Sequence, residues 1–128
     1  MFTGLQINFY VSDVERAVAF YTAIGAVESF RTPREGRPLH VEVTLAGVTV
    51  GLASVDAARD LHGLDVSATG NAAELVLWTG DADAAYDVLV AAGATPMKQP
   101  HVMPNGLRGA WVADPDGNPI EVVQEAEA

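Results

Sequence analysis

The feature that constrains this chain most is an internal repeat. With a shift of 68 residues, DVERAVAFYTAIGA at residues 13–26 aligns without a gap with DADAAYDVLVAAGA at residues 81–94. With a shift of 70 residues, AGVTVGLA at residues 46–53 falls on DGNPIEVV at residues 116–123. Since self-similarity at a fixed period indicates copies of one structural unit, the sequence predicts two halves with the same fold.

Each half predicts one helix among four strands. Apolar residues recur at helical spacing after Asp13 and after Asp81, with Gly25 and Gly93 placed to end the helices. Ser12 and Glu15 have the spacing of a capping box at the start of the first helix. Alternating segments predict one strand before each helix and three after it, at residues 5–11, 26–31, 39–45 and 48–54, and at 74–79, 94–99, 107–113 and 118–124.

This order predicts an α+β fold of two tandem βαβββ modules. We expect a single domain over residues 1–128, with module one at about 1–54 and module two at about 73–124. A connecting loop at about 55–72 joins them. That loop is long for a compact domain, and it can hold a short helix or a hinge along which the modules exchange between subunits.

Composition excludes several classes of function. The 128 residues contain no cysteine, which excludes disulfides, cysteine zinc sites and thiol nucleophiles. The formal net charge of −10 disfavours nucleic acid and anionic lipid and favours cationic ligands. Neither a membrane span nor a secretion signal is found. We therefore expect a cytoplasmic protein with no nucleic-acid or membrane partner.

The predicted strands carry polar and aromatic residues on one face. Successive strand residues face opposite sides of a sheet. In the first strand the helix-facing side is Leu5, Ile7, Phe9 and Val11. The far side of the sheet takes Gln6, Asn8, Tyr10, His40, Glu42, Glu74, Trp78, Trp111 and Glu121. Such a face predicts a cleft or an interface between subunits.

The closing hairpin brings an aromatic ring beside a carboxylate on that face. Asp114, Pro115, Asp116 and Gly117 form a turn sequence, with Pro at the second position and Gly where a left-handed residue is needed. We expect Asp114 to cap the turn. A hairpin of this length places Trp111 opposite Glu121.

Two segments resemble the vicinal oxygen chelate superfamily, which includes glyoxalase I, bleomycin and fosfomycin resistance proteins and extradiol dioxygenases. NFYVSDVERAVAFYTAIGA at residues 8–26 is similar to the first strand and helix of that family. GLRGAWVADPDGNPIEVVQ at residues 106–124 is similar to its closing hairpin. The resemblance implies the glyoxalase/bleomycin resistance fold, in which paired modules form a U-shaped cleft, and a homodimer.

The resemblance also implies where a metal would bind. The family's ligand positions match Gln6, Gly51, Glu74 and Glu121 of this chain. Glycine offers no ligand side chain and no histidine is present in the set, so glyoxalase and dioxygenase chemistry are disfavoured. Gln6, Glu74 and Glu121 form an all-oxygen set that suits Mg²⁺ or Mn²⁺.

Two functions follow as alternatives. The first is metal-independent binding or sequestration of a small molecule, cationic or aromatic, as in antibiotic resistance of the bleomycin type, with no cofactor. Its ligand-binding residues would be Asn8, Tyr10, His40, Glu42, Trp78 and Trp111. The second is a lyase, isomerase or transferase that uses a divalent metal, with His40 and Glu42 as candidate catalytic groups. The ligand, the metal, any reaction and any exchange of modules between subunits are left open by the sequence.

Overall fold

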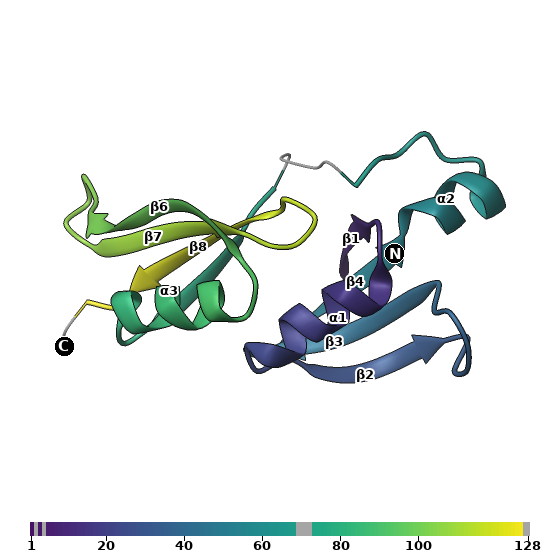
Figure 1. Cartoon of the computed structure of the whole chain (residues 1–128), viewed down its shortest axis with the longest axis horizontal. Helices are drawn as coiled ribbons and strands as arrows, with labels where there is room; N and C mark the ends of the chain where they lie inside the picture. Colours follow the sequence, from purple (N-terminus) through teal and green to yellow (C-terminus); the bar gives the residue numbers. More distant parts are fainter. Residues whose placement is uncertain (2, 4, 69–72, 127–128) are drawn as a thin grey trace. The chain divides into compact units, whose positions relative to one another are not determined.

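The structure, a computed structural model, describes residues 1, 3, 5–68 and 73–126. The chain divides into two compact units, Met1–Ala68 and Thr69–Ala128 (Figure 1). The described part of each unit contains one four-stranded sheet. Among the described residues, none of the helices is both long and apolar enough to span a membrane.

The first unit has the predicted order of strands and one additional helix. Its elements are β1 (Ile7–Val11), α1 (Val14–Ala23), β2 (Val27–Thr32), β3 (His40–Leu45), β4 (Val48–Ser54) and α2 (Val55–His62). The sheet has the order β1-β4-β3-β2, with β1 parallel to β4 and the other neighbours antiparallel. A parallel neighbour requires a crossover connection, which α1 and the two strands after it provide.

The second unit repeats this topology. Its elements are β5 (Leu75–Thr79), α3 (Ala82–Ala91), β6 (Thr95–Val102), β7 (Arg108–Ala113) and β8 (Pro119–Gln124). The sheet order β5-β8-β7-β6 matches that of the first unit element by element, again with one parallel pair. The two tandem βαβββ modules predicted from the repeat are therefore confirmed.

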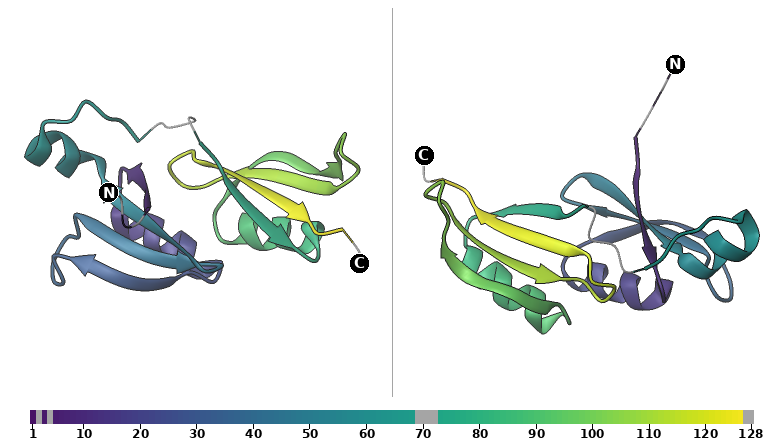
Figure 2. Two further views of the ribbon diagram at one scale, coloured as in Figure 1. Left: turned by 180° about the vertical axis from the view of Figure 1, so that it is seen from behind. Right: turned by 90° about the horizontal axis from the view of Figure 1, so that it is seen from above.

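Each sheet buries one face under its helix. In Figures 1 and 2, α1 lies against the first sheet and α3 against the second. The fully buried side chains of these layers include Val11, Val41, Val43 and Leu52 in the first unit and Val112, Ile120 and Val122 in the second. The helices thus lie on the apolar side of each sheet, which leaves the opposite side to the polar and aromatic residues.

Two residues predicted to face the helix are exposed instead. Leu5 precedes β1 and is 93% exposed, and Ile7 at the start of that strand is 44% exposed. Both lie ahead of Phe9 and Val11, which are buried. These differences arise because the alternation extends beyond the area that each helix covers.

The helix caps correct one prediction. Asp13, rather than Ser12, is the N-cap of α1, because its carboxylate accepts a hydrogen bond from the Arg16 backbone N–H at 3.1 Å. The predicted capping box of Ser12 and Glu15 is therefore wrong by one residue. Ser12 instead accepts a hydrogen bond from the Arg16 guanidinium. Asp81 caps α3 in the same way, as predicted.

The predicted connecting loop begins with α2. Ser54 caps this helix by accepting a hydrogen bond from the Ala57 N–H, and Gly63 ends it with a left-handed backbone at φ 65°. Val55 and Ala58 are its buried residues. The helix is thereby fixed to the end of β4, and it contributes to the pocket described below.

Candidate functional site

The polar face of the first sheet is organised in rows across the strands. Asn8 on β1, Gly51 on β4 and Glu42 on β3 are direct neighbours. In the next row, Ala53 lies between Tyr10 and His40. Residues paired across strands face the same side of a sheet, so the registers place four of the predicted ligand-binding residues, Asn8, Tyr10, His40 and Glu42, on one surface.

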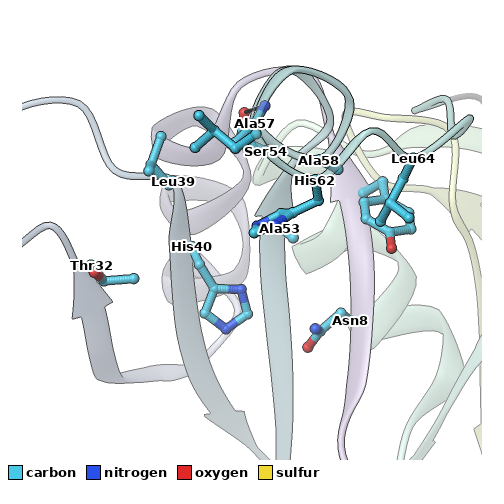
Figure 3. Close-up of a pocket in the computed structure, with 12 residues that line it drawn as sticks. Asn8, Thr32, Leu39, His40, Ala53, Ser54, Ala57, Ala58, His62 and Leu64 are labelled. Atoms are coloured by element: carbon cyan, nitrogen blue, oxygen red, sulfur yellow. Dashed lines mark hydrogen bonds between the residues drawn. The ribbon is translucent and has the colours of Figure 1, made fainter.

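Gly51 leaves room in this surface for two neighbouring side chains. A Cβ atom at this position would collide with Asn8 Oδ1 and would lie 2.8 Å from both Asn8 Cγ and His40 Cε1. Asn8 and His40 therefore approach each other over the glycine, as Figure 3 shows for the two side chains. In this chain, the space that a ligand side chain at position 51 would need is therefore occupied by Asn8 and His40.

His40 has a carboxylate partner. Its Nε2 lies 3.0 Å from Glu42 Oε2, and both side chains are half-buried. The sequence had given His40 no identified partner, because residues two apart on a strand share a face without necessarily touching. Glu42 thus orients the imidazole ring. On the other side of the row, Asn8 Oδ1 accepts a hydrogen bond from Gln6 Nε2 at 2.8 Å.

Asn8 and His40, together with Tyr10, line a pocket of about 360 Å³ in the first unit. The pocket lies between the polar face of the sheet and α2 (Figure 3). Its lining consists of Asn8, Tyr10, Thr32, Leu39, His40, Ala53, Ser54, Ala57, Ala58, Leu61, His62 and Leu64. The volume falls within the range of small-molecule sites, about 300–1,000 Å³.

The α2 side of this pocket was missed by sequence reasoning. Leu61 and His62 lie near the end of α2, and Leu64 follows Gly63. The available signal was the Ser54 cap followed by eight residues that end at a glycine, which is a helix pattern inside the predicted connecting loop. His62 is the last residue of α2, and it lines the pocket.

The second unit carries an aromatic and acidic surface. Glu121 on β8 is flanked by Val76 on β5 and by Trp111 on β7. The predicted pairing of Trp111 with Glu121 is therefore confirmed. The Trp111 indole N–H donates a hydrogen bond to Glu74 Oε2 at 3.1 Å. Two carboxyl groups and an indole ring thus meet on the face that the repeat predicts.

The carboxyl group of Glu121 is held away from its ordinary titration range. Burial is the first cause that raises its pKa, and the neighbouring Glu74 raises it further through a hydrogen bond and through charge repulsion. Two carboxyl groups this close cannot both ionise freely. A cation placed beside them would relieve the repulsion.

Two further rings extend this surface. Trp78 on β5 is 59% exposed and pairs with Val123. The His101 ring on β6 lies with its centroid 6.0 Å from that of Trp111. His101 lies on β6 because this strand extends to Val102, three residues beyond the predicted end at residue 99.

The metal set of the family does not fit the residues of the first unit. Gly51 has no ligand atom in a side chain, its side-chain space is filled, and the Gln6 amide is bonded to Asn8. Over residues 5–68 and 73–126, no group of three or more His, Asp or Glu side chains could hold a metal ion. The all-oxygen set of Gln6, Glu74 and Glu121 takes residues from both units and stays a prediction.

Comparisons with known proteins agree on one family. The family model described as Glyoxalase/Bleomycin resistance protein/Dioxygenase superfamily matches residues 5–122. No curated protein is significantly similar in sequence to the chain.

Solved structures extend the comparison to the fold. A member of this superfamily from Sphaerobacter thermophilus is 32% identical with a TM-score of 0.73, and the match covers 98% of each chain. A glyoxalase-related enzyme from Fulvimarina pelagi is 22% identical with a TM-score of 0.82, over 98% of this chain and 89% of that one. A bleomycin-binding protein complexed with bleomycin is 18% identical with a TM-score of 0.66, over 98% of this chain and 100% of that one.

Proposed function

Because the chain belongs to the glyoxalase/bleomycin resistance protein/dioxygenase superfamily, we propose that it binds a small aromatic cation without a metal and without converting it. The observation that carries the proposal is the pocket of the first unit, in which Asn8, Tyr10 and His40 meet beside α2. Sequestration of this kind would suit a resistance protein in the cytoplasm, and we propose a homodimer as its assembly.

The lining of the pocket favours a flat ligand with an apolar part. Leucine and alanine side chains from β4, α2 and the segment after it provide most of the apolar surface. Tyr10 and His40 add rings that can stack on an aromatic ligand. Asn8 adds an amide that can fix the orientation of the ligand.

Electrostatics favour a positive charge on the ligand. The lining contains neither lysine nor arginine, and Glu42 lies directly behind His40. The whole chain carries a formal charge of −10, which attracts cations and repels anions.

One of the similar structures also supports binding. It is a bleomycin-binding protein complexed with bleomycin, so this fold can hold an organic ligand. The filled position at Gly51 supports metal independence, because it removes one of the family's ligands.

Isothermal titration with three probes of similar size tests this proposal. We expect phenethylammonium to bind more tightly than phenethyl alcohol, and phenylacetate to bind weakest or not at all. EDTA should leave the affinity unchanged. Leu61→Arg, which introduces a positive charge among the apolar lining, should abolish binding, whereas the exposed Val102→Arg of β6 should not. Binding of phenylacetate at least as tight as that of phenethylammonium would refute the cation preference.

The Glu74 and Glu121 carboxyl groups favour one second candidate, a divalent-metal enzyme of the same superfamily. Their mutual repulsion would be relieved by Mg²⁺ or Mn²⁺, with Gln6 as a third oxygen ligand in the predicted set. Metal analysis of the purified protein followed by Mn²⁺ titration separates the candidates. Tight uptake that is lost in Glu121→Gln would favour the enzyme over metal-independent binding.

A further inference from the structure

We propose that the ligand of the first unit's pocket carries an N–H donor, so that protonated amines bind more tightly than quaternary ammonium compounds. This inference rests on the proposed function and names the chemical class of cation within it. Its basis is the hydrogen bond between His40 and Glu42.

The partner of His40 determines which ring nitrogen carries the proton. An ionised carboxylate can only accept hydrogen bonds. At 3.0 Å from Glu42 Oε2, the Nε2 atom of a neutral His40 therefore carries the hydrogen. The other ring nitrogen, Nδ1, is then an acceptor with a lone pair in the plane of the ring.

The geometry directs this acceptor toward the pocket. His40 lines the pocket, whereas Glu42, which holds the Nε2 side of the ring, does not. The Cε1 atom between the two nitrogens lies above Gly51, and the ring points toward Asn8 across β4 (Figure 3). The ring edge that carries Nδ1 is thus the edge available to a ligand.

A protonated amine can donate a hydrogen bond to His40 Nδ1, and its positive charge is attracted by the Glu42 carboxylate. Its N–H donates to Nδ1, and the negative Glu42 on the far side of the ring strengthens the bond. Tyr10 and His62 are the other titratable groups of the lining. A quaternary ammonium has no N–H and would leave Nδ1 desolvated without a partner, which costs about 1–3 kcal/mol in proteins, or about 5- to 140-fold in affinity.

A matched series of ligands tests the inference. At pH 8, isothermal titration compares phenethylammonium, its N,N-dimethyl derivative and its N,N,N-trimethyl derivative. The dimethyl compound is nearly as bulky as the trimethyl compound but keeps one N–H. We expect the first two to bind with similar affinity and the third to bind about tenfold more weakly or worse.

The outcomes distinguish this inference from the proposed function. Equal affinity of the dimethyl and trimethyl compounds would overturn the inference while leaving cation binding intact. Failure of all three compounds to bind would overturn the proposed function. In His40→Phe, which keeps a ring but removes the acceptor, we expect the preference for the dimethyl compound to disappear while the trimethyl compound binds as before.

A measurement without ligand tests the role of Glu42 as a positioning residue. Long-range proton–nitrogen NMR spectra report which nitrogen of His40 carries the hydrogen. We expect the Nε2–H form in the wild type and a mixture of forms in Glu42→Gln, because the glutamine amide can both donate and accept. The preference for the dimethyl compound should fall in parallel. A wild-type spectrum of the Nδ1–H form would contradict the inference.

Discussion

Asn8 occupies the space that any side chain at Gly51 would need. The two residues are direct neighbours in the register of β1 and β4, and a Cβ atom at position 51 would collide with the Asn8 amide. The glycine at a ligand position of the family is therefore part of a packed surface. Asn8 and His40 depend on it for their approach.

Gly51→Ala should consequently destabilise the first unit and weaken its pocket. We expect a loss of about 1–3 kcal/mol in the free energy of unfolding, because overpacking forces Asn8 and His40 to move. Urea denaturation measures the loss, and titration with phenethylammonium measures the pocket. Gly80→Ala is the matched control, since no atom lies within 4 Å of its added Cβ.

A double substitution tests whether the collision with Asn8 causes the loss of stability in Gly51→Ala. In the Asn8→Ala, Gly51→Ala protein the amide no longer blocks the added methyl group. The combined loss of stability should then be smaller than the sum of the two single losses, by about 1 kcal/mol, as for residues in direct contact. Simple additivity would show that Asn8 is not the residue displaced.

The turn between β7 and β8 should be sensitive to Asp114. This side chain is buried, and it accepts hydrogen bonds from the backbone N–H groups of Asp116 and Asn118 and from the Asn118 amide. Asp114→Ala removes these acceptors from buried donors, so we expect a loss of about 3 kcal/mol in urea denaturation. Asp114→Asn keeps one acceptor oxygen and should lose less.

The corrected cap of α1 leads to a further prediction about stability. Asp13→Ala should cost about 1 kcal/mol, because it removes the acceptor of the Arg16 N–H. Ser12→Ala should cost less, since Ser12 precedes the N-cap and accepts a hydrogen bond from the Arg16 side chain at an exposed position. Thermal denaturation of the two variants checks the order, and a larger effect of Ser12→Ala would restore the capping box as the start of the helix.

Most of the fold was predictable because both halves of the sequence carry the same pattern of alternating strands around one helix. Asp81 and Gly93 bound α3 as predicted, and the turn at Asp114 to Gly117 fixes the pairing of Trp111 with Glu121. These helix ends and this turn depend on a few neighbouring residues, and each of these short sequences favours one local structure. The cap at Asp13 was missed because Ser12 and Asp13 are both good capping residues, and only the backbone geometry decides between them.

The site was predictable as a face but not as a set of contacts. Alternation placed His40 and Glu42 on the same side of β3, yet their hydrogen bond depends on side-chain torsions that no pattern encodes. The contribution of Leu61 and His62 depends on how α2 folds back over the sheet. The packing of a helix on a sheet is a tertiary property. The alternation of residues along the strands therefore could not predict which α2 residues line the pocket.

The raised pKa of Glu121 gives a prediction with a definite sign. In the folded protein this carboxyl group binds its proton more tightly than in the unfolded chain, where its pKa is near the ordinary value of 4.5. Its contribution to stability is therefore full below pH 4.5 and is lost as the pH rises through the folded pKa. Glu121→Gln, which cannot ionise, should be more stable than the wild type at pH 7, by about 0.5–1 kcal/mol.

Urea denaturation between pH 4 and pH 7 tests this expectation. The advantage of Glu121→Gln should shrink toward pH 4, where the wild-type carboxyl group is protonated in both states. Glu74→Gln should show the same trend, because it removes the charge that repels Glu121. Glu35→Gln in the exposed segment between β2 and β3 makes the same change in net charge and should not. If all three variants follow the same pH dependence, the effect belongs to the net charge of −10 and not to the pair of carboxyl groups.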